Sequence, residues 1–444
     1  MKFFKHVSGS QFILATFLVL IMVGTGLLML PMAAKGETSL SLLDALFTAT
    51  SASCVTGLVI VDTGTFFSTF GQLVILGLIQ IGGLGVMTFA TLFSVALGRK
   101  INLAERLRIQ ESLNKNEIEG VVGLCLRVVK YTFIIEFIFG SILAYSFYNI
   151  YGIKGIYFGY WHAVSAFCNA GFDLIGNFRS FTPFINNYSI NLCIMILIIL
   201  GGLGFSVLAN LFHFPKRGLK SLSLHTKVVL TSTSVLLLIS FLMFFFVEIN
   251  HLPGYNSLDN VTRVFAGMFQ AVTLRTAGFN TLDFGLMTDT TLFFMIVMMF
   301  IGASPGSTGG GIKTTTAAVI LIKTWNLLRG NDEVVVFDKT VKNDAINKAF
   351  IIVVISIIWI VTATLLVSYF ENLDFIRVSF EVVSAFATVG LSTGITQNIG
   401  SASKVVLILT MFAGRVGILT FTLSLFATNR RKKVRYPEEN ILIG

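Results

Sequence analysis

The hydrophobic positions of this chain form eight long runs in four pairs, with one shorter amphipathic run inside each pair. The first runs of the pairs cover residues 12–32, 127–150, 228–249 and 349–370, and the second runs cover 69–97, 186–212, 288–328 and 402–428. About 20 consecutive apolar residues are enough for a helix to cross a bilayer. The pattern therefore predicts an all-α membrane protein with eight transmembrane helices.

The four shorter runs are too short to cross a bilayer. They cover residues 40–53, 156–168, 259–275 and 375–387, which corresponds to about 20–25 Å of helix. Such segments fit half-helices that enter the membrane and return. Because non-helical backbone at membrane depth must be buried or line water, we expect the segments that follow the half-helices to surround a central pore. The partially negative C-terminal ends of the half-helices would favour cations there.

The composition agrees with a membrane protein. Only 12% of the 444 residues are charged and 55% are hydrophobic, whereas soluble domains carry about 25% charged residues. The four cysteines (Cys54, Cys125, Cys168 and Cys193) lie in or beside apolar stretches without metal-type spacing, and we expect them to be buried. We expect one ion-translocating domain over 1–444. Its four repeats cover 10–98, 125–213, 226–328 and 347–429, followed by a tail at 430–444.

Lysine and arginine residues indicate the orientation. Of the 32 basic residues, 24 lie in the first 11 residues, in the stretches 98–130, 213–227 and 313–348, or after residue 428. Eight crossings put all five stretches on one side, which the positive-inside rule makes cytoplasmic. We therefore expect both termini in the cytoplasm, and four parallel repeats related by rotation about the membrane normal. The net charge of +10 then reflects orientation and does not indicate nucleic-acid binding.

Each half-helix is followed by a short loop with a glycine near its centre. These glycine loops, numbered 1 to 4, are 54–58, 168–172, 275–279 and 387–391, and their glycines lie 114, 107 and 112 residues apart. Glycine tolerates positive φ and adds no side chain that would crowd an ion. Backbone carbonyls from four such loops can replace the water around K⁺. The candidate filter residues are Val55, Thr56, Gly57, Asn169, Ala170, Gly171, Thr276, Ala277, Gly278, Thr388, Val389 and Gly390.

The second run of the third repeat is interrupted by a glycine-rich segment, 302–315. A proline and several glycines prevent a continuous helix there, and apolar helix resumes at Ala317. By the repeat symmetry, the segment lies below loop 3 and obstructs the path on the cytoplasmic side. The candidate gate residues are Gly302, Ala303, Ser304, Pro305, Gly306, Ser307, Thr308, Gly309, Gly310 and Gly311. The other second runs carry glycine clusters at 82–85, 201–204 and 414–417, a pattern typical of close helix packing.

Charges inside membrane helices are costly and usually face the protein interior or a water-filled path. Arg415 lies in the middle of the last run, level with the glycine-rich segment. We expect it to bond carbonyls or hydroxyls of that segment and close the path; the alternative is pairing with a carboxylate. Glu136 and Glu381 either coordinate a cation or pair with neighbours, and we favour pairing. Six outer acidic residues either concentrate cations or form a solvated rim: Asp44, Asp62, Asp173, Asp259, Asp283 and Asp374.

The glycine loops resemble the four pore loops of the Trk and Ktr family of potassium-uptake proteins. The whole chain follows that family's pattern and is most similar to the Ktr-type membrane subunit, since its first span begins at residue 12 without an extra helix pair. The family's loops are degenerate versions of a TVGYG filter that keep one glycine per repeat. A serine at the first of these positions accompanies sodium preference in some plant relatives, so Gly57 favours potassium. The resemblance also implies a gating role for 302–315 and supports the same role for Arg415.

The resemblance implies partners as well. It predicts a homodimer in the lipid of the plasma membrane, a cytosolic ring of nucleotide-binding regulatory subunits of the KtrA type, and Na⁺ as an activator. We expect K⁺ as the transported ion and no nucleotide on this chain, because its cytoplasmic stretches are short and contain no nucleotide-binding fold. The alternative is a symporter that couples K⁺ to Na⁺ or H⁺. No nucleophile–base pair or metal cluster indicates an enzyme.

Overall fold

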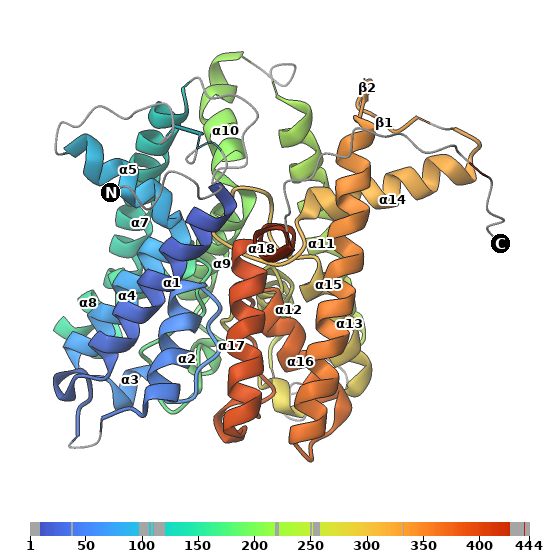
Figure 1. Cartoon of the computed structure of the whole chain (residues 1–444). Coiled ribbons are helices and arrows are strands. Elements are labelled where there is room, and N and C mark those ends of the chain that lie inside the picture. The colour runs from blue at the N-terminus through green and yellow to red at the C-terminus, as the bar shows by residue number, and fades with distance from the viewer. Residues whose placement is uncertain are drawn as a thin grey trace.

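A computed structural model describes residues 9–36, 39–96, 106–107, 110, 120–217, 222–248, 251, 258–331, 333–426 and 439. The described chain is mostly helical, as the sequence predicts (Figure 1). The predicted tail at 430–444 lies outside the described residues except for Glu439, and so do the basic residues near the N-terminus. All four cysteines are buried, as expected, and none of them forms a disulfide.

The helices predicted as first crossings and the predicted half-helices form close to the predicted ranges. The long helices are α1 (Gly9–Leu28), α7 (Val121–Tyr151), α11 (Leu224–Phe246) and α15 (Asn343–Phe370). The half-helices are α2 (Leu42–Ser53), α8 (Ile153–Phe167), α12 (Asn260–Thr273) and α16 (Phe375–Phe386). Polar caps begin two of them, because the first turn of a helix leaves amides unpaired. Ser41 caps α2 and Asp259 caps α12; bonds from the hydroxyl and amide of Thr262 hold the pKa of Asp259 below its ordinary value.

The second crossings are divided in every repeat. They form α4 (Thr69–Leu84) with α5 (Val86–Ala96), α9 (Tyr188–Leu203) with α10 (Phe205–Arg217), α13 (Asp289–Phe300) with α14 (Thr314–Leu328), and α17 (Ser401–Val416) with α18 (Ile418–Phe426). The sequence predicted a break in the third repeat alone, so the other three breaks correct that prediction. Gly85, Gly204 and Gly417 have φ values of 88°, 93° and 94°, which a right-handed helix cannot contain.

The breaks shorten the helices that could cross a membrane. Among the described residues, three helices are long and apolar enough to cross a membrane: Gln11–Leu28, Leu224–Phe246 and Asn343–Phe370. Tyr188–Leu203 and Phe205–Phe212 add a fourth if this pair, bent by 103°, counts as one span. Thr69–Leu84 and Asp289–Phe300 are apolar but shorter. The count of eight crossings therefore stays a prediction.

Smaller elements connect the long ones. They are α3 (Thr63–Phe66), the 3-10 turns η2 (Pro31–Ala33), η3 (Thr182–Phe184), η7 (Phe284–Leu286) and η8 (Thr396–Asn398), and the strands β1 (Val335–Val336) and β2 (Lys339–Thr340). The two strands form an antiparallel hairpin in which Val335 pairs with Thr340. Helix α14 extends sideways from the body beside this hairpin (Figure 1).

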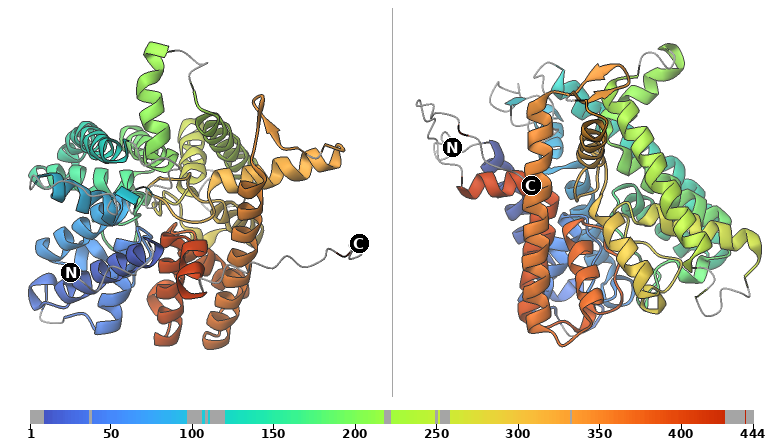
Figure 2. Two further views of the ribbon diagram at one scale, coloured as in Figure 1. Left: turned by 45° about the horizontal axis from the view of Figure 1, so that its top comes forward. Right: turned by 90° about the vertical axis from the view of Figure 1, so that its right-hand side faces the viewer.

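The repeats follow one another around a centre. Half-helix α2 packs against α4 of its own repeat and α17 of the fourth repeat, and α8 packs against α9 of its own repeat and α4 of the first. Half-helix α16 likewise contacts α17 and α13, while α12 contacts α9 of the preceding repeat. The left panel of Figure 2 shows the four groups in chain order, from blue to red, around a common middle. Each half-helix is thus held at least in part by a neighbouring repeat.

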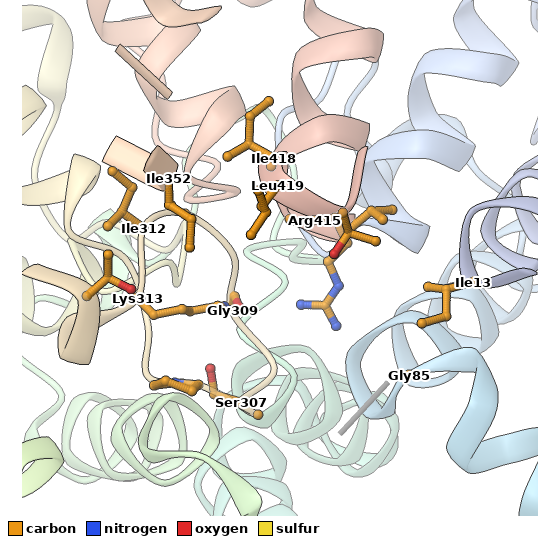
Figure 3. Close-up of a pocket in the computed structure, with 18 of the residues that line it drawn as sticks. Ile13, Gly85, Ser307, Gly309, Ile312, Lys313, Ile352, Arg415, Ile418 and Leu419 are labelled. Carbon is orange, nitrogen blue, oxygen red and sulfur yellow. Dashed lines mark hydrogen bonds between the residues drawn. The ribbon is translucent and has the colours of Figure 1, made fainter. Parts of the chain in front are cut away.

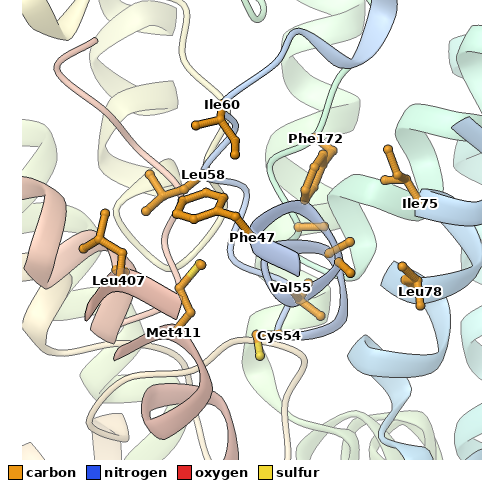
Figure 4. Close-up of a cluster of buried hydrophobic side chains, with 14 of the residues drawn as sticks. Phe47, Cys54, Val55, Leu58, Ile60, Ile75, Leu78, Phe172, Leu407 and Met411 are labelled. Carbon is orange, nitrogen blue, oxygen red and sulfur yellow. The ribbon is translucent and has the colours of Figure 1, made fainter. Parts of the chain in front are cut away.

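Apolar side chains hold the first half-helix in place (Figure 4). Phe47 of α2 is fully buried in a cluster with Ile75 of α4, Met411 of α17 and Phe172 of loop 2. Burial of an aromatic or aliphatic side chain of this size contributes about 1.5–3 kcal/mol. At the other end of α2, the Lys404 ammonium lies 2.7 Å from the Asp44 carboxylate and joins the fourth repeat to the first.

The mid-span glycine clusters have two separate roles. The last glycine of each cluster ends a helix, as described above. The first glycine allows close packing: a methyl group on Gly82 would collide with the carbonyl oxygen of Ser53, and one on Gly414 would collide with that of Phe386. Both carbonyls lie at the C-terminal ends of half-helices. The packing role inferred from the sequence is therefore present at these glycines, and the helix break is an additional role.

We expect Gly82→Ala to lower the stability of the protein by about 1–3 kcal/mol, because overpacking in a dense interior forces the backbone to shift. Gly77→Ala is the matched control, since Gly77 lies in the same helix with nothing within 4 Å of an added methyl group. Because alanine is the better helix former, Gly77→Ala should leave stability unchanged or slightly higher. Thermal unfolding of both purified variants in detergent measures the difference. Equal midpoints for the two variants would contradict the packing role.

Candidate ion pathway

The four glycine loops share one backbone conformation. Val55, Asn169, Thr276 and Thr388, each two residues before a loop glycine, have φ values of 59°, 58°, 59° and 50°. Gly57, Gly171, Gly278 and Gly390 have φ values of 94°, 71°, 78° and 84°. Left-handed φ at a non-glycine residue is uncommon and, for a β-branched residue, strained. Its recurrence at the same position in all four loops indicates that the surrounding packing imposes it.

Each loop is tied back to the half-helix that precedes it. The amides of Thr56, Ala170 and Val389 each donate to the backbone carbonyl of a serine five residues earlier, at 2.8 Å. In the third repeat, the Ala277 amide donates to the carbonyl of Thr273 at 3.1 Å. The loops therefore continue directly from the C-terminal ends of the half-helices, where the helix dipole is negative.

The glycine loops meet in a closed sequence. A methyl group on Gly57 would lie 2.5 Å from the carbonyl oxygen of Ala170, and one on Gly171 would lie 3.0 Å from that of Ala277. A methyl group on Gly278 would lie 2.7 Å from the Val389 oxygen.

Loop 4 contacts loop 1 and so completes the ring of contacts. A methyl group on Gly390 would collide with the Thr56 oxygen and lie 2.8 Å from the Cα atom of Gly57. Loops 1, 2, 3 and 4 thus contact one another in chain order. All twelve predicted loop residues lie in this one region, and all are buried.

Polar side chains behind the loops hold their outer ends. Glu381 of α16 is 1% exposed and accepts hydrogen bonds from the Thr393 amide at 3.1 Å and the Thr396 hydroxyl at 3.0 Å, as well as from Ser392. In the second repeat, His162 accepts a bond from the Leu174 amide at 3.1 Å. The pairing role favoured for Glu381 agrees with these contacts.

The glycine-rich segment lies directly against loops 2, 3 and 4. The Thr308 hydroxyl lies 3.3 Å from the side-chain oxygen of Asn169, and the Gly310 amide donates to the Thr388 hydroxyl at 2.9 Å. A methyl group on Gly309 would collide with the Thr276 hydroxyl. Repeat symmetry predicted this segment next to loop 3, and the structure adds contacts with loops 2 and 4.

The segment is folded and well bonded. The Gly302 amide donates to the Ile312 carbonyl at 2.9 Å, which closes the segment at its base. The Phe205 amide at the start of α10 donates to the Gly306 carbonyl at 2.8 Å. The Lys313 ammonium donates to the Gly309 carbonyl at 2.7 Å. The segment therefore shares backbone hydrogen bonds with the broken crossing of the second repeat.

Arg415 joins the segment to the first repeat. One of its terminal nitrogens donates to the Thr308 carbonyl, and the other donates to the Gly82 carbonyl and, at 3.1 Å, to the Gly83 carbonyl. The two glycine carbonyls are available because α4 ends at Leu84, which leaves its last carbonyls without helical partners. No carboxylate pairs with Arg415 among the residues that the structure describes.

A cavity of about 730 Å³ lies next to the segment, several of whose residues line it (Figure 3). It is lined by the breaks of all four second crossings, including Gly85, Phe205, Thr315 and Ile418. Lys313, Lys348 and Arg415 also line it, and none of its described lining residues is acidic. Helix N-termini carry partial positive charge, and the start of α10 at Phe205 faces the same cavity.

The sequence matches the model of the TrkH family, described as cation transport protein, over residues 2–433. The chain belongs to the TrkH family. Ktr system potassium uptake protein B of Bacillus subtilis (strain 168) is 43% identical to it over 96% of this chain and 95% of that protein. Potassium/sodium uptake protein NtpJ of Enterococcus hirae is 37% identical to it over 99% of this chain and 98% of that protein. The crystal structure of the potassium transporter TrkH from Vibrio parahaemolyticus has a TM-score of 0.75 at 18% identity, covers 95% of this chain and 86% of that one, and therefore shows the same fold.

Family membership makes this TrkH-family chain a multi-pass membrane protein of a cation-transport family, in agreement with the resemblance noted from its loops.

Most outer acidic residues in this TrkH-family chain have structural partners. Asp62 accepts from the Thr65 and Phe178 amides, both at 2.7 Å, and Asp283 accepts from the Gly285 amide at 2.8 Å. Asp44 and Asp374 form ion pairs with Lys404 and Arg377. Helix capping and pairing thus account for these residues without a cation.

Sequence reasoning missed the roles of two basic residues of this TrkH-family chain. Lys313 bonds the glycine-rich segment, as described above. Arg275, at the start of loop 3, is only 6% exposed, and neither of its terminal nitrogens has a hydrogen-bond partner among the described residues. The sequence does carry a signal for Arg275, because a charged residue directly precedes Thr276 in loop 3. The count of basic residues that indicates orientation does not distinguish it from the others. A buried charge without a partner is costly to folding.

We expect Arg275→Met to keep or raise the thermal stability of the TrkH-family chain, because replacing an unpaired buried charge with an apolar side chain of similar length removes a desolvation cost. Arg377→Met is the control, since Arg377 has a partly exposed side chain and lies 3.6 Å from Asp374; it should change stability by about 0–1 kcal/mol. Thermal unfolding in detergent compares the two variants. A larger loss for Arg275→Met than for Arg377→Met would contradict the expectation.

Proposed function

We propose that this protein is a channel-like potassium-uptake subunit in which K⁺ passes through the ring of glycine loops. One observation carries the proposal: the carbonyl oxygens of Thr56, Ala170, Ala277 and Val389 each lie against the glycine of a neighbouring loop. Oxygens from four repeats that converge in this way can replace the hydration shell of K⁺. The names of the relatives, which include potassium uptake proteins, support K⁺ as the ion.

The half-helices add to cation binding in this proposal. Helices α2, α8, α12 and α16 all end directly before a loop, and the negative ends of their dipoles stabilise a cation at the centre. The left-handed residues two positions before each glycine keep the four loops alike. The loops differ in sequence from one another, so we expect fewer equivalent ion sites than in a filter of four identical loops.

We expect Gly171→Ser to reduce discrimination between K⁺ and Na⁺ while the protein still folds. Gly171 has a φ of 71°, and a Cβ atom there would lie 2.8 Å from the Cα atom of Gly278, so serine would deform the ring. Gly394→Ser is the matched control, because Gly394 has a φ of 91° with nothing within 4 Å of an added Cβ atom. Uptake of rubidium and sodium into liposomes measures selectivity. If Gly171→Ser retained the selectivity of the control, the filter assignment would be wrong.

Residues 302–311 and Arg415 form the gate in this proposal. The segment lies against three of the four loops on one side of the ring, and the Arg415 guanidinium holds it through the Thr308 carbonyl. A positive charge in a low-dielectric path repels K⁺ strongly. Opening therefore requires the segment to leave the loops and Arg415 to give up the carbonyls of Gly82 and Gly83.

We expect Arg415→Ala to raise basal rubidium uptake several-fold, because both the restraint on the segment and the repelling charge are lost. Arg377→Ala, which removes an arginine away from this contact, serves as the control and should leave uptake near the wild-type level. Flux into liposomes that contain the purified chain alone gives the basal rate. Wild-type basal uptake and unchanged regulation in Arg415→Ala would rule out this gate.

The alternative function is symport of K⁺ with Na⁺ or H⁺. A relative named potassium/sodium uptake protein is compatible with it. Coupling would need an ion or proton site, for which Glu136 and Glu381 are the candidates. The contacts of Glu381 with two hydroxyls and an amide favour a structural role instead. Rapid uptake in the absence of any sodium or proton gradient would exclude obligatory coupling.

Regulation in this proposal comes from other chains. Three relatives are named as proteins of a Ktr potassium uptake system, which supports a homodimer that binds a cytosolic ring of nucleotide-binding regulatory subunits. We place both termini and the basic stretches on the cytoplasmic side, where the ring would dock. Sodium then acts as an activator, no nucleotide binds to this chain, and the chain carries out no enzymatic reaction.

A further inference from the structure

A second cavity opens on the outer face of the second repeat, away from the ring of loops. Its volume is about 520 Å³, and its lining residues are Phe133, Ile134, Glu136, Phe137, Ile138, Tyr160 and Val164. The first five belong to α7 and the last two to α8. Phe133 and Phe137 are 50% and 65% exposed, so the mouth of the cavity lies on the apolar surface that faces lipid.

Glu136 lies at the inner wall of this cavity with little compensation for its charge. The residue is 4% exposed. Both of its carboxylate oxygens lie 3.1 Å from one amide nitrogen of Gln80, and no other residue that the structure describes donates a hydrogen bond to them. The nearby Tyr160 hydroxyl is bonded to Ser141 at 2.9 Å. A carboxylate can accept about four hydrogen bonds, and its ionised form is costly to bury unless a cation pairs with it.

An inorganic cation does not fit this cavity. Small hard cations need several oxygen ligands, and the side chains of the lining residues offer only the Glu136 carboxylate and one tyrosine hydroxyl. The remaining lining side chains are aliphatic or aromatic. Aromatic rings attract organic cations through their faces, and a cavity of 300–1,000 Å³ with one charged group is typical of a small-molecule site.

We propose that this cavity binds a hydrophobic amine that enters from the membrane. Its ammonium group donates to Glu136, and its apolar body packs against Phe133, Phe137 and Tyr160. The ligand supplies the counter-charge that Gln80 does not. Gln80 also accepts a hydrogen bond from the Cys168 thiol at 3.5 Å, and Cys168 directly precedes Asn169 of loop 2. The site therefore borders the ion pathway, but the proposal does not depend on the function proposed above.

Binding of 4-phenylbutylamine to the full-length protein in lipid nanodiscs tests the site. The neutral 4-phenylbutan-1-ol has nearly the same size and apolar body. We expect saturable binding of the amine at least tenfold tighter than binding of the alcohol, measured by ligand-observed NMR with competition. Equal affinity for the two compounds would mean that only lipid-like apolar contacts operate, and would overturn the proposal. No binding of either compound, as when a second copy of the chain covers the cavity, would overturn it as well.

Two variants identify the residues involved. Glu136→Gln keeps the shape of the side chain and should remove the tenfold preference for the amine, whereas Glu333→Gln makes the same change at an exposed carboxylate and should keep it. Ile134→Trp fills the cavity from a position that is 44% exposed, retains Glu136, and should abolish binding of the amine. Retention of the preference in Glu136→Gln, or of binding in a folded Ile134→Trp protein, would contradict the proposal.

Discussion

The structure depends on four backbone loops that approach one another too closely to admit a side chain. Each loop glycine lies against the carbonyl of the next repeat, and the left-handed residue two positions earlier keeps that geometry alike in all four. Such strained backbone persists only when its surroundings determine it. The half-helices provide those surroundings, because α2, α8 and α16 are each packed between the second crossings of two adjacent repeats and α12 packs against that of the repeat before it.

The broken second crossings have a common consequence. A helix that ends at a positive-φ glycine leaves free carbonyls on one side of the break and free amides on the other. Arg415 uses the carbonyls at the end of α4, and the amide at the start of α10 bonds the glycine-rich segment. The same breaks line the cavity next to the glycine-rich segment, together with Lys313, Lys348 and Arg415. The breaks thus hold the segment in place.

Intramembrane charges in this protein have different surroundings. Glu381 is surrounded by hydroxyl and amide donors that hold the end of loop 4, and Arg415 is surrounded by carbonyls. Glu136 and Arg275 are buried with few or no partners. Burial without compensating partners costs stability, so folding alone does not explain the presence of these two charged residues in the interior.

The sequence by itself predicted the membrane class, the half-helices and the positions of the loop glycines, because hydrophobic run length and glycine spacing are local properties. It also indicated that residues 302–315 and Arg415 lie at one level. The contacts that the glycines, the glycine-rich segment and Arg415 make depend on the tertiary structure. The breaks at Gly85, Gly204 and Gly417 were not predicted, since a glycine in an apolar run allows either close packing or positive φ, and neighbouring repeats select between them. The contacts of Arg415 with Gly82 and of the glycine-rich segment with three loops join residues far apart in sequence, which no local pattern specifies.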